Sequence, residues 1–223
     1  MKANNKVALL GTLGGFKRAP FHDSSWDKWA LNTMYEVLTV AELESVSRWF
    51  ELHPHTALTQ SRRPDSHWLT LDALNIPIYS FYELPNIRNQ CLFPLEDIER
   101  TFSPFGASYF ACTFSYQIAL AIMEGYTTIG IYGAPLTYAR EGLVERPCVE
   151  RWLGFAEGRG LSVVVEHDEP EGLYRHAGRY AKDDHKERYG AYVYTLRHAQ
   201  SIVTWLVNET KRLNLSNVGY GDQ

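Results

Sequence analysis

Short apolar runs bounded by turn residues recur through most of the chain. They cover residues 6–10 (KVALL), 26–32, 48–53, 76–81, 129–132 and 161–166. Runs of this length and composition are typical of strands that a parallel sheet buries on both faces. Helical patterns lie between several of them, at 41–46, 94–102, 118–123 and 149–158. The alternation predicts an α/β fold, with a Rossmann-like, mostly parallel sheet and helices on both faces.

The stretch from residue 110 to 136 (FACTFSYQIALAIMEGYTTIGIYGAPL) organises this pattern. We expect a helix capped by Thr113 or Ser115, a tight turn at Gly125, and a buried strand ending at Gly133. The free backbone N–H groups of such a helix start suit an anion. Gly133 follows the carboxyl end of its strand, where open α/β sheets bind their ligands. Thr113, Ser115 and Gly133 are therefore candidate ligand-binding residues.

The last quarter of the chain has a different pattern. A charged stretch, residues 167–186, follows the predicted nucleotide-binding domain (1–166) as a linker, and a polar tail covers 214–223. Between them, residues 187–213 are predicted to form one long helix with a heptad repeat. Its two series are Tyr189, Leu196, Val203 and Thr210, and Tyr192, Ala199, Leu206 and Leu213. Such a helix packs on the domain or on a second copy of itself, and we expect a homo-oligomer.

Composition narrows the class of protein. The formal net charge of -4 and the pI near 6.1 argue against a broad nucleic-acid-binding surface. The three cysteines form no CxxC pair, which indicates a reducing compartment. No apolar run is long enough to span a membrane, and the chain begins with a strand pattern rather than a signal peptide. These features predict a cytoplasmic protein.

Candidate ligand-binding residues follow the first two strands. A glycine-rich loop, residues 11–15, comes directly after the first strand. Gly11, Thr12 and Gly14 are placed there to contact a phosphate, or the loop is a tight turn that binds nothing. After the second strand come Asn32 and Tyr35. Asn32 can read a base or ribose through its donor and acceptor groups, or it is a turn residue.

Histidines and a carboxylate cluster at the end of the third strand. Alternation places Glu51 and His53 on one face, with His55 close behind and His67 a short loop later. Glu51 and His53 can form an acid/base pair, or the group is an incomplete site for zinc or manganese. The third reading is that these are loop histidines without a role. Arg62 and Arg63, in the polar stretch that follows, reach an anionic ligand or are solvated.

A final group lies in the predicted active-site loop at 136–149 and the helix after it. Tyr138 and Arg146 fall in the loop, and Arg146 can clamp a phosphate or carboxylate. Glu150 begins the helix and lies two turns from Glu157 on the same face. That spacing alone is typical of a solvated face, and Glu150 is kept as a ligand-binding candidate.

Residues 113–136 resemble a segment of the bacterial sialyltransferases that use CMP-activated sugars, and of the related motility-accessory and hydroxymethylpterin-pyrophosphokinase-like proteins. The first glycine loop, together with Asn32 and Tyr35, resembles the early nucleotide-binding elements of that superfamily. Along its length the chain also resembles uncharacterised Rossmann-like proteins of bacteriophages. The combined match spans about residues 6–166.

The resemblance implies a nucleotide-binding fold with Gly11, Asn32, Thr113 and Ser115 on the nucleotide side. The chain departs from the family pattern in two places. Its first loop lacks the Asn, Pro and Ser of the family, and Ala134 and Pro135 stand where an acidic residue is common.

Three functions follow from these observations. The first is a nucleotide- or nucleotide-sugar-dependent transferase, glycosyltransferase-like, in which Glu51 orients His53 as general base and Arg146 stabilises the leaving phosphate. The second is a binding protein that sequesters a nucleotide without turnover, which the two departures favour. The third is a nucleotide or sugar hydrolase that uses His53, His55 and a divalent metal.

Overall fold

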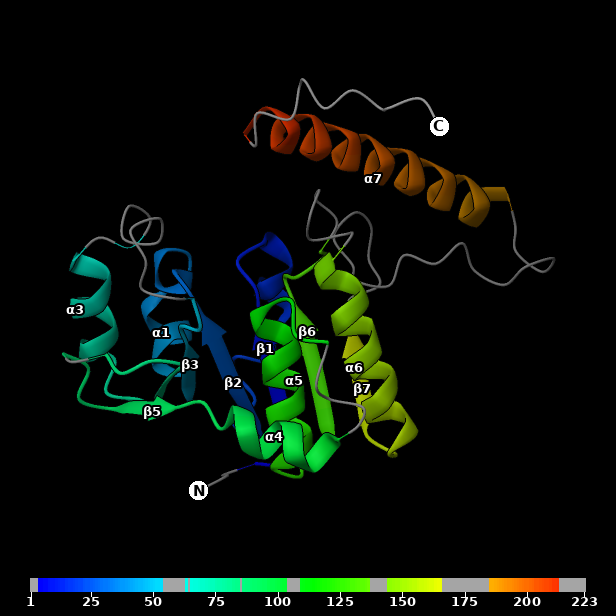
Figure 1. Ribbon diagram of the computed structural model, residues 1–223. Coiled ribbons are helices and arrows are strands. Elements are labelled where there is room, and N and C mark those ends of the chain that lie inside the picture. The colour runs from blue at the N-terminus through cyan, green and yellow to red at the C-terminus, as the bar shows by residue number, and fades with distance from the viewer. Residues whose placement is uncertain are drawn as a thin grey trace.

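A computed structural model describes residues 4–53, 63, 65–84, 86–103, 109–136, 144–165 and 185–212, and for 185–198 the backbone alone. Seven strands form one all-parallel sheet in the order β5-β4-β3-β2-β1-β6-β7 (Figure 1). The strands are β1 Lys6–Leu10, β2 Trp26–Leu31, β3 Arg48–Phe50, β4 Ile78–Ser80, β5 Gln90–Leu92, β6 Thr128–Tyr132 and β7 Ser162–Val165. The α/β, Rossmann-like fold class predicted from the sequence is confirmed.

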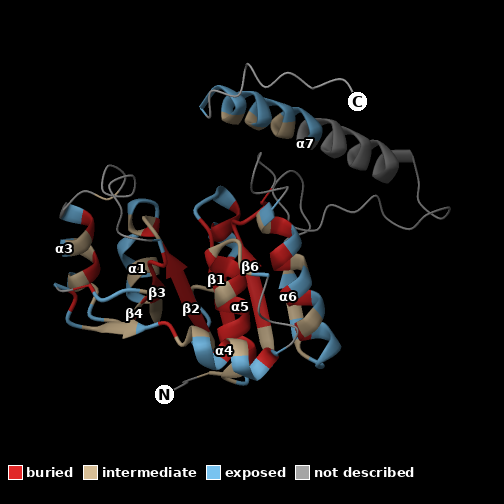
Figure 2. Ribbon diagram, in the orientation of Figure 1, coloured by how far each residue is buried: buried red, intermediate tan, exposed pale blue. Residues whose placement is uncertain are grey.

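Helices cover both faces of the sheet. They are α1 Val40–Glu44, α3 Asp65–Ala73, α4 Leu95–Phe102, α5 Thr113–Met123 and α6 Arg146–Gly158, with 3-10 turns η1 Gly14–Arg18 and η2 Met34–Glu36. A last helix, α7 His185–Arg212, contributes none of its described side chains to either core. Val7 and Leu9 pack in one core with α4, α5 and α6, whereas Ala8 and Leu10 pack in a second core with η1, η2 and α3. Figure 2 shows the resulting buried centre, in which β1, β2 and β6 are red over most of their length.

Strand order reverses at β1, and this reversal locates the candidate site. The chain adds β2 to β5 on one side of β1, then returns to add β6 and β7 on the other side. Loops that follow β1 and β6 therefore leave the sheet in opposite senses at one point of its carboxyl edge. In open α/β sheets this is where ligands bind.

Three predicted elements differ from the structure. Residues 82–91 were expected to be loop, but β5 begins within them because its backbone pairs with β4. The sequence has no apolar pattern there that would predict a strand. The strand β7 was expected to be buried, yet it lies at the sheet edge and alternates between exposed and half-buried residues. Helix α6 begins at Arg146 rather than Val149, since Pro147 is favoured in a first helical turn. Arg146 therefore lies on a helix and not in a loop.

Side chains lock the amino edge of the sheet. The carboxylate of Asp27, which is buried, accepts hydrogen bonds from the Tyr126 hydroxyl (2.5 Å) and from Asn4 Nδ2 (2.9 Å). Arg48 pairs with Glu124 at 2.7 Å and lies over the ring of Trp29. Buried charges are tolerated only when they are paired, so these contacts join β2 and β3 to α5 and the start of β6.

Backbone packing locks the carboxyl edge. The N–H of Leu13 donates to the carbonyl of Gly133 at 3.2 Å. A Cβ on Gly11 would collide with that carbonyl, and a Cβ on Gly133, whose φ is +70°, would lie 2.5 Å from the Leu13 carbonyl oxygen. Both glycines are therefore required by the contact between the β1 and β6 loops.

This packing predicts a large loss of stability in Gly133→Ala. A side chain at positive φ costs roughly 1–2 kcal/mol, and forced overpacking adds about 1–3 kcal/mol. Gly125→Ala is the matched control, because Gly125 has φ +75° but no atom within 4 Å of the added Cβ. In urea unfolding, Gly133→Ala should lose at least about twice the free energy that Gly125→Ala loses. Equal losses would show that the loops do not pack as described.

Candidate functional site

A buried carboxylate lies at the carboxyl end of β3. The side chain of Glu51 is 1% exposed, and its two oxygens contact nitrogen atoms of three neighbouring side chains. Oε1 lies 3.2 Å from His53 Nδ1, and Oε2 lies 3.0 Å from Arg63 Nε and 3.1 Å from His67 Nε2. These contacts give the buried charge the partners that it needs.

The partners set the ionisation of Glu51. Burial by itself raises the pKa of its carboxyl group, but the neighbouring imidazoles of His53 and His67 and the charge of Arg63 outweigh burial and lower the pKa to about 2. Glu51 is therefore a carboxylate at neutral pH and can only accept hydrogen bonds.

His53 is the accessible member of this cluster, with 47% of its side chain exposed. Because its Nδ1 faces a carboxylate, Nδ1 carries the proton, and in the neutral ring the lone pair lies on Nε2. A carboxylate that fixes the tautomer of an imidazole is the arrangement that general bases use. Glu51 and His53, both singled out from the sequence, thus meet in a geometry suited to proton transfer.

Asn32 and Tyr35 lie beside this cluster. Asn32 adopts φ +52°, its N–H donates to the Phe50 carbonyl, and its own carbonyl accepts from Trp49 Nε1. The ring of Tyr35 stacks on Trp49, and its hydroxyl lies 2.9 Å from His67 Nδ1. Asn32 Oδ1 is buried and has no hydrogen-bond partner within the described part of the chain. This oxygen is therefore a hydrogen-bond acceptor that the fold leaves unused beside the cluster.

The glycine loop after β1 divides into two parts. Gly11 is buried against Gly133, so the conformational freedom of both glycines serves loop packing. Thr12 and Gly14 are exposed at the same edge of the sheet. Of the predicted loop residues, these two are the ones placed to meet a ligand.

Residues of the first turn of α5 hydrogen-bond to one another at the start of the helix. Cys112, rather than Thr113 or Ser115, is the N-cap residue, and Ser115 occupies the third helical position. The Ser115 hydroxyl is fully buried and donates to the Cys112 carbonyl at 2.6 Å. Burial raises the pKa of the Cys112 thiol to about 12, so this sulfur stays protonated at neutral pH. Thr113 is also buried, which leaves little of this turn open.

Arg146 forms an ion pair at the start of α6, where its Nε lies 2.6 Å from Glu150 Oε1. The Arg146 side chain is mostly buried, and Glu150 is about one third exposed. The pair joins two predicted site residues one helical turn apart. It lies over the β6 side of the sheet, away from the Glu51 cluster. His55 and Tyr138 lie outside the described residues.

Two members of the cluster were noted in the sequence near Glu51 but were not assigned a role in the site. Arg63 and His67 reach Glu51 from a polar stretch in which no spacing relates them to β3. Only a pattern of His and Arg soon after a strand end hints at them. Across the described ranges, no three His, Cys, Asp or Glu side chains gather in a way that could hold a metal.

Comparisons with known proteins give one structural likeness. The sialyltransferase CstII from Campylobacter jejuni, solved with the substrate analogue cytidine-5'-monophosphate, aligns with a TM-score of 0.46 and 16% identity, over 71% of this chain and 78% of CstII. No protein-family model matches the chain, and no curated protein matches it. Within the described residues, no helix is long and apolar enough to cross a membrane.

The Glu51 cluster predicts an acid-sensitive contribution to stability. Since the pKa of Glu51 in the folded protein lies below its usual 4.5, its contribution is complete above pH 4.5 and is lost as pH falls towards 2. The fall from 4.5 to about 2 corresponds to roughly 3 kcal/mol. The difference in unfolding free energy between the wild type and Glu51→Gln should therefore be large at pH 6 and shrink towards pH 2.

Glu157→Gln is the control, because Glu157 is exposed on α6. Its difference from the wild type should stay nearly constant over this pH range. A Glu51→Gln difference that is equally flat would contradict the described ion pairs.

Proposed function

We propose that the protein is a nucleotide- or nucleotide-sugar-dependent transferase that works at the carboxyl edge of the sheet. The observation that carries the proposal is the contact between Glu51 Oε1 and His53 Nδ1 beside an exposed imidazole. A structural histidine does not need a buried carboxylate on one nitrogen and solvent on the other. The pair also lies at the edge where parallel sheets bind ligands.

The geometry supports a defined role for His53. An acceptor hydroxyl bonded to His53 Nε2 gives up its proton as its oxygen attacks the transferred group, and the bond from that group to the leaving phosphate breaks. Glu51 stabilises the imidazolium that forms, because its carboxylate is already ionised. General-base catalysis of this kind contributes roughly 10²–10⁴-fold to a rate.

Strand spacing supports an extended ligand. The ends of β3 and β6 are separated by two strands, which places them about 14 Å apart at about 4.8 Å per interval. A single ligand that reaches from His53 to Gly133 must be elongated, as a nucleotide sugar is. Asn32 and Thr12 lie at the strand ends between them, and Arg146 is the cation on the β6 side.

One observation favours a binding protein without turnover as the second candidate. Gly11 and Ser115, two of the positions expected to hold phosphates, are occupied in contacts within the fold. A nucleotide would then be held by fewer groups, with His53 as a hydrogen-bonding partner. Replacement of His53 separates the two functions.

The prediction for His53→Gln is loss of turnover with binding retained. The experiment screens nucleotides and nucleotide sugars by thermal shift, with and without magnesium or manganese, and follows each hit by mass spectrometry. Saturating ligand at about 100 times its Kd stabilises the fold by roughly 2.7 kcal/mol, so hits are visible. For a consumed ligand, His53→Gln should lower kcat by about 10²-fold or more, with Kd changed less than about threefold.

His22→Gln is the control, because His22 is exposed in the loop before β2. A His53→Gln variant that loses affinity while no ligand is consumed would favour the binding protein. No shift with any nucleotide would contradict both candidates.

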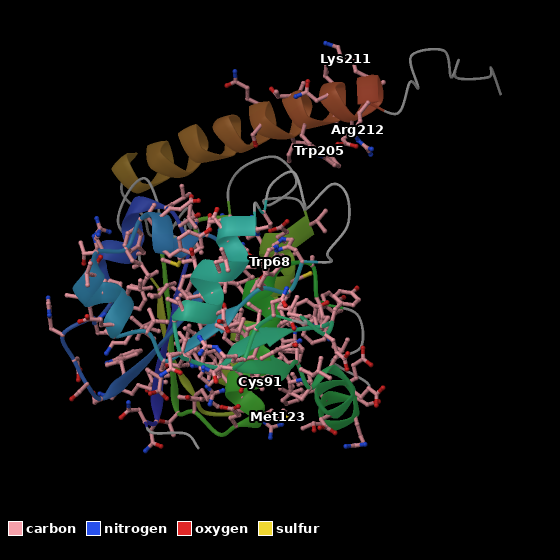
Figure 3. The ribbon with its side chains drawn as sticks, turned by 90° about the vertical axis from the view of Figure 1, so that its left-hand side faces the viewer. Trp68, Cys91, Met123, Trp205, Lys211 and Arg212 are labelled. Atoms are coloured by element: carbon pink, nitrogen blue, oxygen red, sulfur yellow. The ribbon has the colours of Figure 1, made fainter. Side chains whose placement is uncertain are left out.

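We also propose that α7 pairs with α7 of a second copy. Val203, Leu206 and Val207 are each about half exposed and lie on one face at helical spacing. The face continues the heptad series through Ala199 and Thr210, and such a repeat is completed by an identical helix. Figure 3 shows the side chain of Trp205 projecting from this helix. Two further properties of this protein, its cytoplasmic location and its likeness to bacteriophage proteins, remain predictions from the sequence.

The α7 proposal predicts that Val203→Glu with Leu206→Glu produces a monomer. Charges on the apolar face oppose pairing, whereas Asn208→Glu places a charge on the opposite face, where the residue is exposed. Light scattering after size exclusion should give a dimer or larger assembly for the wild type and for Asn208→Glu. A wild-type monomer at about 100 μM would contradict the proposal, since helix pairs of biological use form well below this concentration.

A further inference from the structure

A second histidine lies behind the Glu51–His53 pair. His67, on the first turn of α3, is completely buried. Its Nδ1 lies 2.9 Å from the Tyr35 hydroxyl, and its Nε2 lies 3.1 Å from Glu51 Oε2. The ring packs edge-to-face on Trp68, which Figure 3 shows on α3. His67 thus links η2, α3 and the end of β3 through both of its nitrogens.

The proton positions in this chain follow from its chemistry. A carboxylate has no proton to give and would repel a lone pair 3.1 Å away, so the proton of the neutral His67 ring lies on Nε2, next to Glu51 Oε2. In the neutral ring, Nδ1 then accepts the proton of the Tyr35 hydroxyl. Tyr35 thus donates to His67, and the protonated Nε2 of His67 lies against the Glu51 carboxylate as a charge contact without a regular hydrogen bond. In the opposite tautomer of His67, the lone pairs of Nε2 and Oε2 would face each other.

The two oxygens of Glu51 are divided between inner and outer partners. Oε2 contacts Arg63 and His67, whereas Oε1 contacts His53. Because Oε2 is held from two directions, the carboxyl group cannot rotate without losing both contacts. Oε1 is consequently fixed in direction, and this fixes where the Nδ1 proton of His53 must point.

We infer that His67 is a positioning residue that acts through Glu51 to hold His53 in the tautomer with its lone pair on the exposed Nε2. This inference rests on the proposed role of His53 as general base. His67 is completely buried, so its effect on chemistry passes through the carboxylate that it contacts.

Two substitutions separate positioning from packing. His67→Gln places an amide near the Nε2 position and keeps a donor for Glu51. His67→Asn places its amide near the Nδ1 position, keeps a partner for Tyr35 and loses the contact with Glu51. Both variants are polar and smaller than histidine, so a packing role predicts similar effects for the two.

The test reads the His53 ring directly by ¹⁵N–¹H long-range NMR on the full chain, with the His53 signals assigned by their loss in His53→Gln. The wild type and His67→Gln should show the Nδ1–H tautomer in large excess at pH 8. In His67→Asn the tautomer ratio should fall at least about threefold, since one of the contacts that orient Glu51 is gone. Equal ratios in all three proteins would overturn the inference.

If His67→Asn does not fold, His67→Leu takes its place, because Leu has no donor for Glu51: a fallen tautomer ratio supports the inference and an unchanged one overturns it. With a ligand that is consumed, His67→Asn should also lower kcat about tenfold with little change in KM, and His67→Gln should not. The NMR result needs no ligand. A failure of the proposed function would therefore appear as absent turnover with the tautomer difference intact.

Discussion

The carboxylate of Glu51 is buried at the end of β3, and its need for positive and N–H partners decides how the surrounding segments meet. An unpaired carboxylate inside a protein is strongly destabilising. Arg63, His67 and His53 therefore have to converge on it from the chain beyond β3 and from α3. Tyr35 joins through His67. What results is an ordered set of donors with one exposed imidazole at its outer end.

Two kinds of packing hold the sheet on which this cluster stands. Paired side chains such as Arg48 with Glu124 close the amino edge, while glycine backbones in the β1 and β6 loops close the centre of the carboxyl edge. Rigid strands bring groups from different loops to one line. Polar side chains lie on either side of the glycine contact, with His53 and Asn32 towards β3 and the Arg146–Glu150 pair towards β6, and His53 is the most exposed of them.

Much of the fold could be predicted because its strands are buried on both faces and bear a clear apolar pattern. The same alternation placed Glu51 and His53 on one face, and their contact at 3.2 Å follows from it. Contacts that depend on tertiary structure could not be predicted. The sequence spacing does not show that His67 contacts Glu51. A glycine that is needed for loop packing, such as Gly11, also cannot be distinguished by sequence from a glycine in an ordinary turn. The edge strand β5 has too few apolar residues to be predicted from the sequence pattern.

The central claim is that a nucleotide ligand lies along the carboxyl edge with its reacting group at His53. A crystal structure of the protein with a nucleotide or nucleotide sugar found by thermal shift tests this most directly. The account predicts ligand density over the ends of β3, β2, β1 and β6, with the reacting group about 3–3.5 Å from where an acceptor oxygen on His53 Nε2 would lie. A ligand bound elsewhere, or one that leaves His53 in contact with solvent alone, would contradict it.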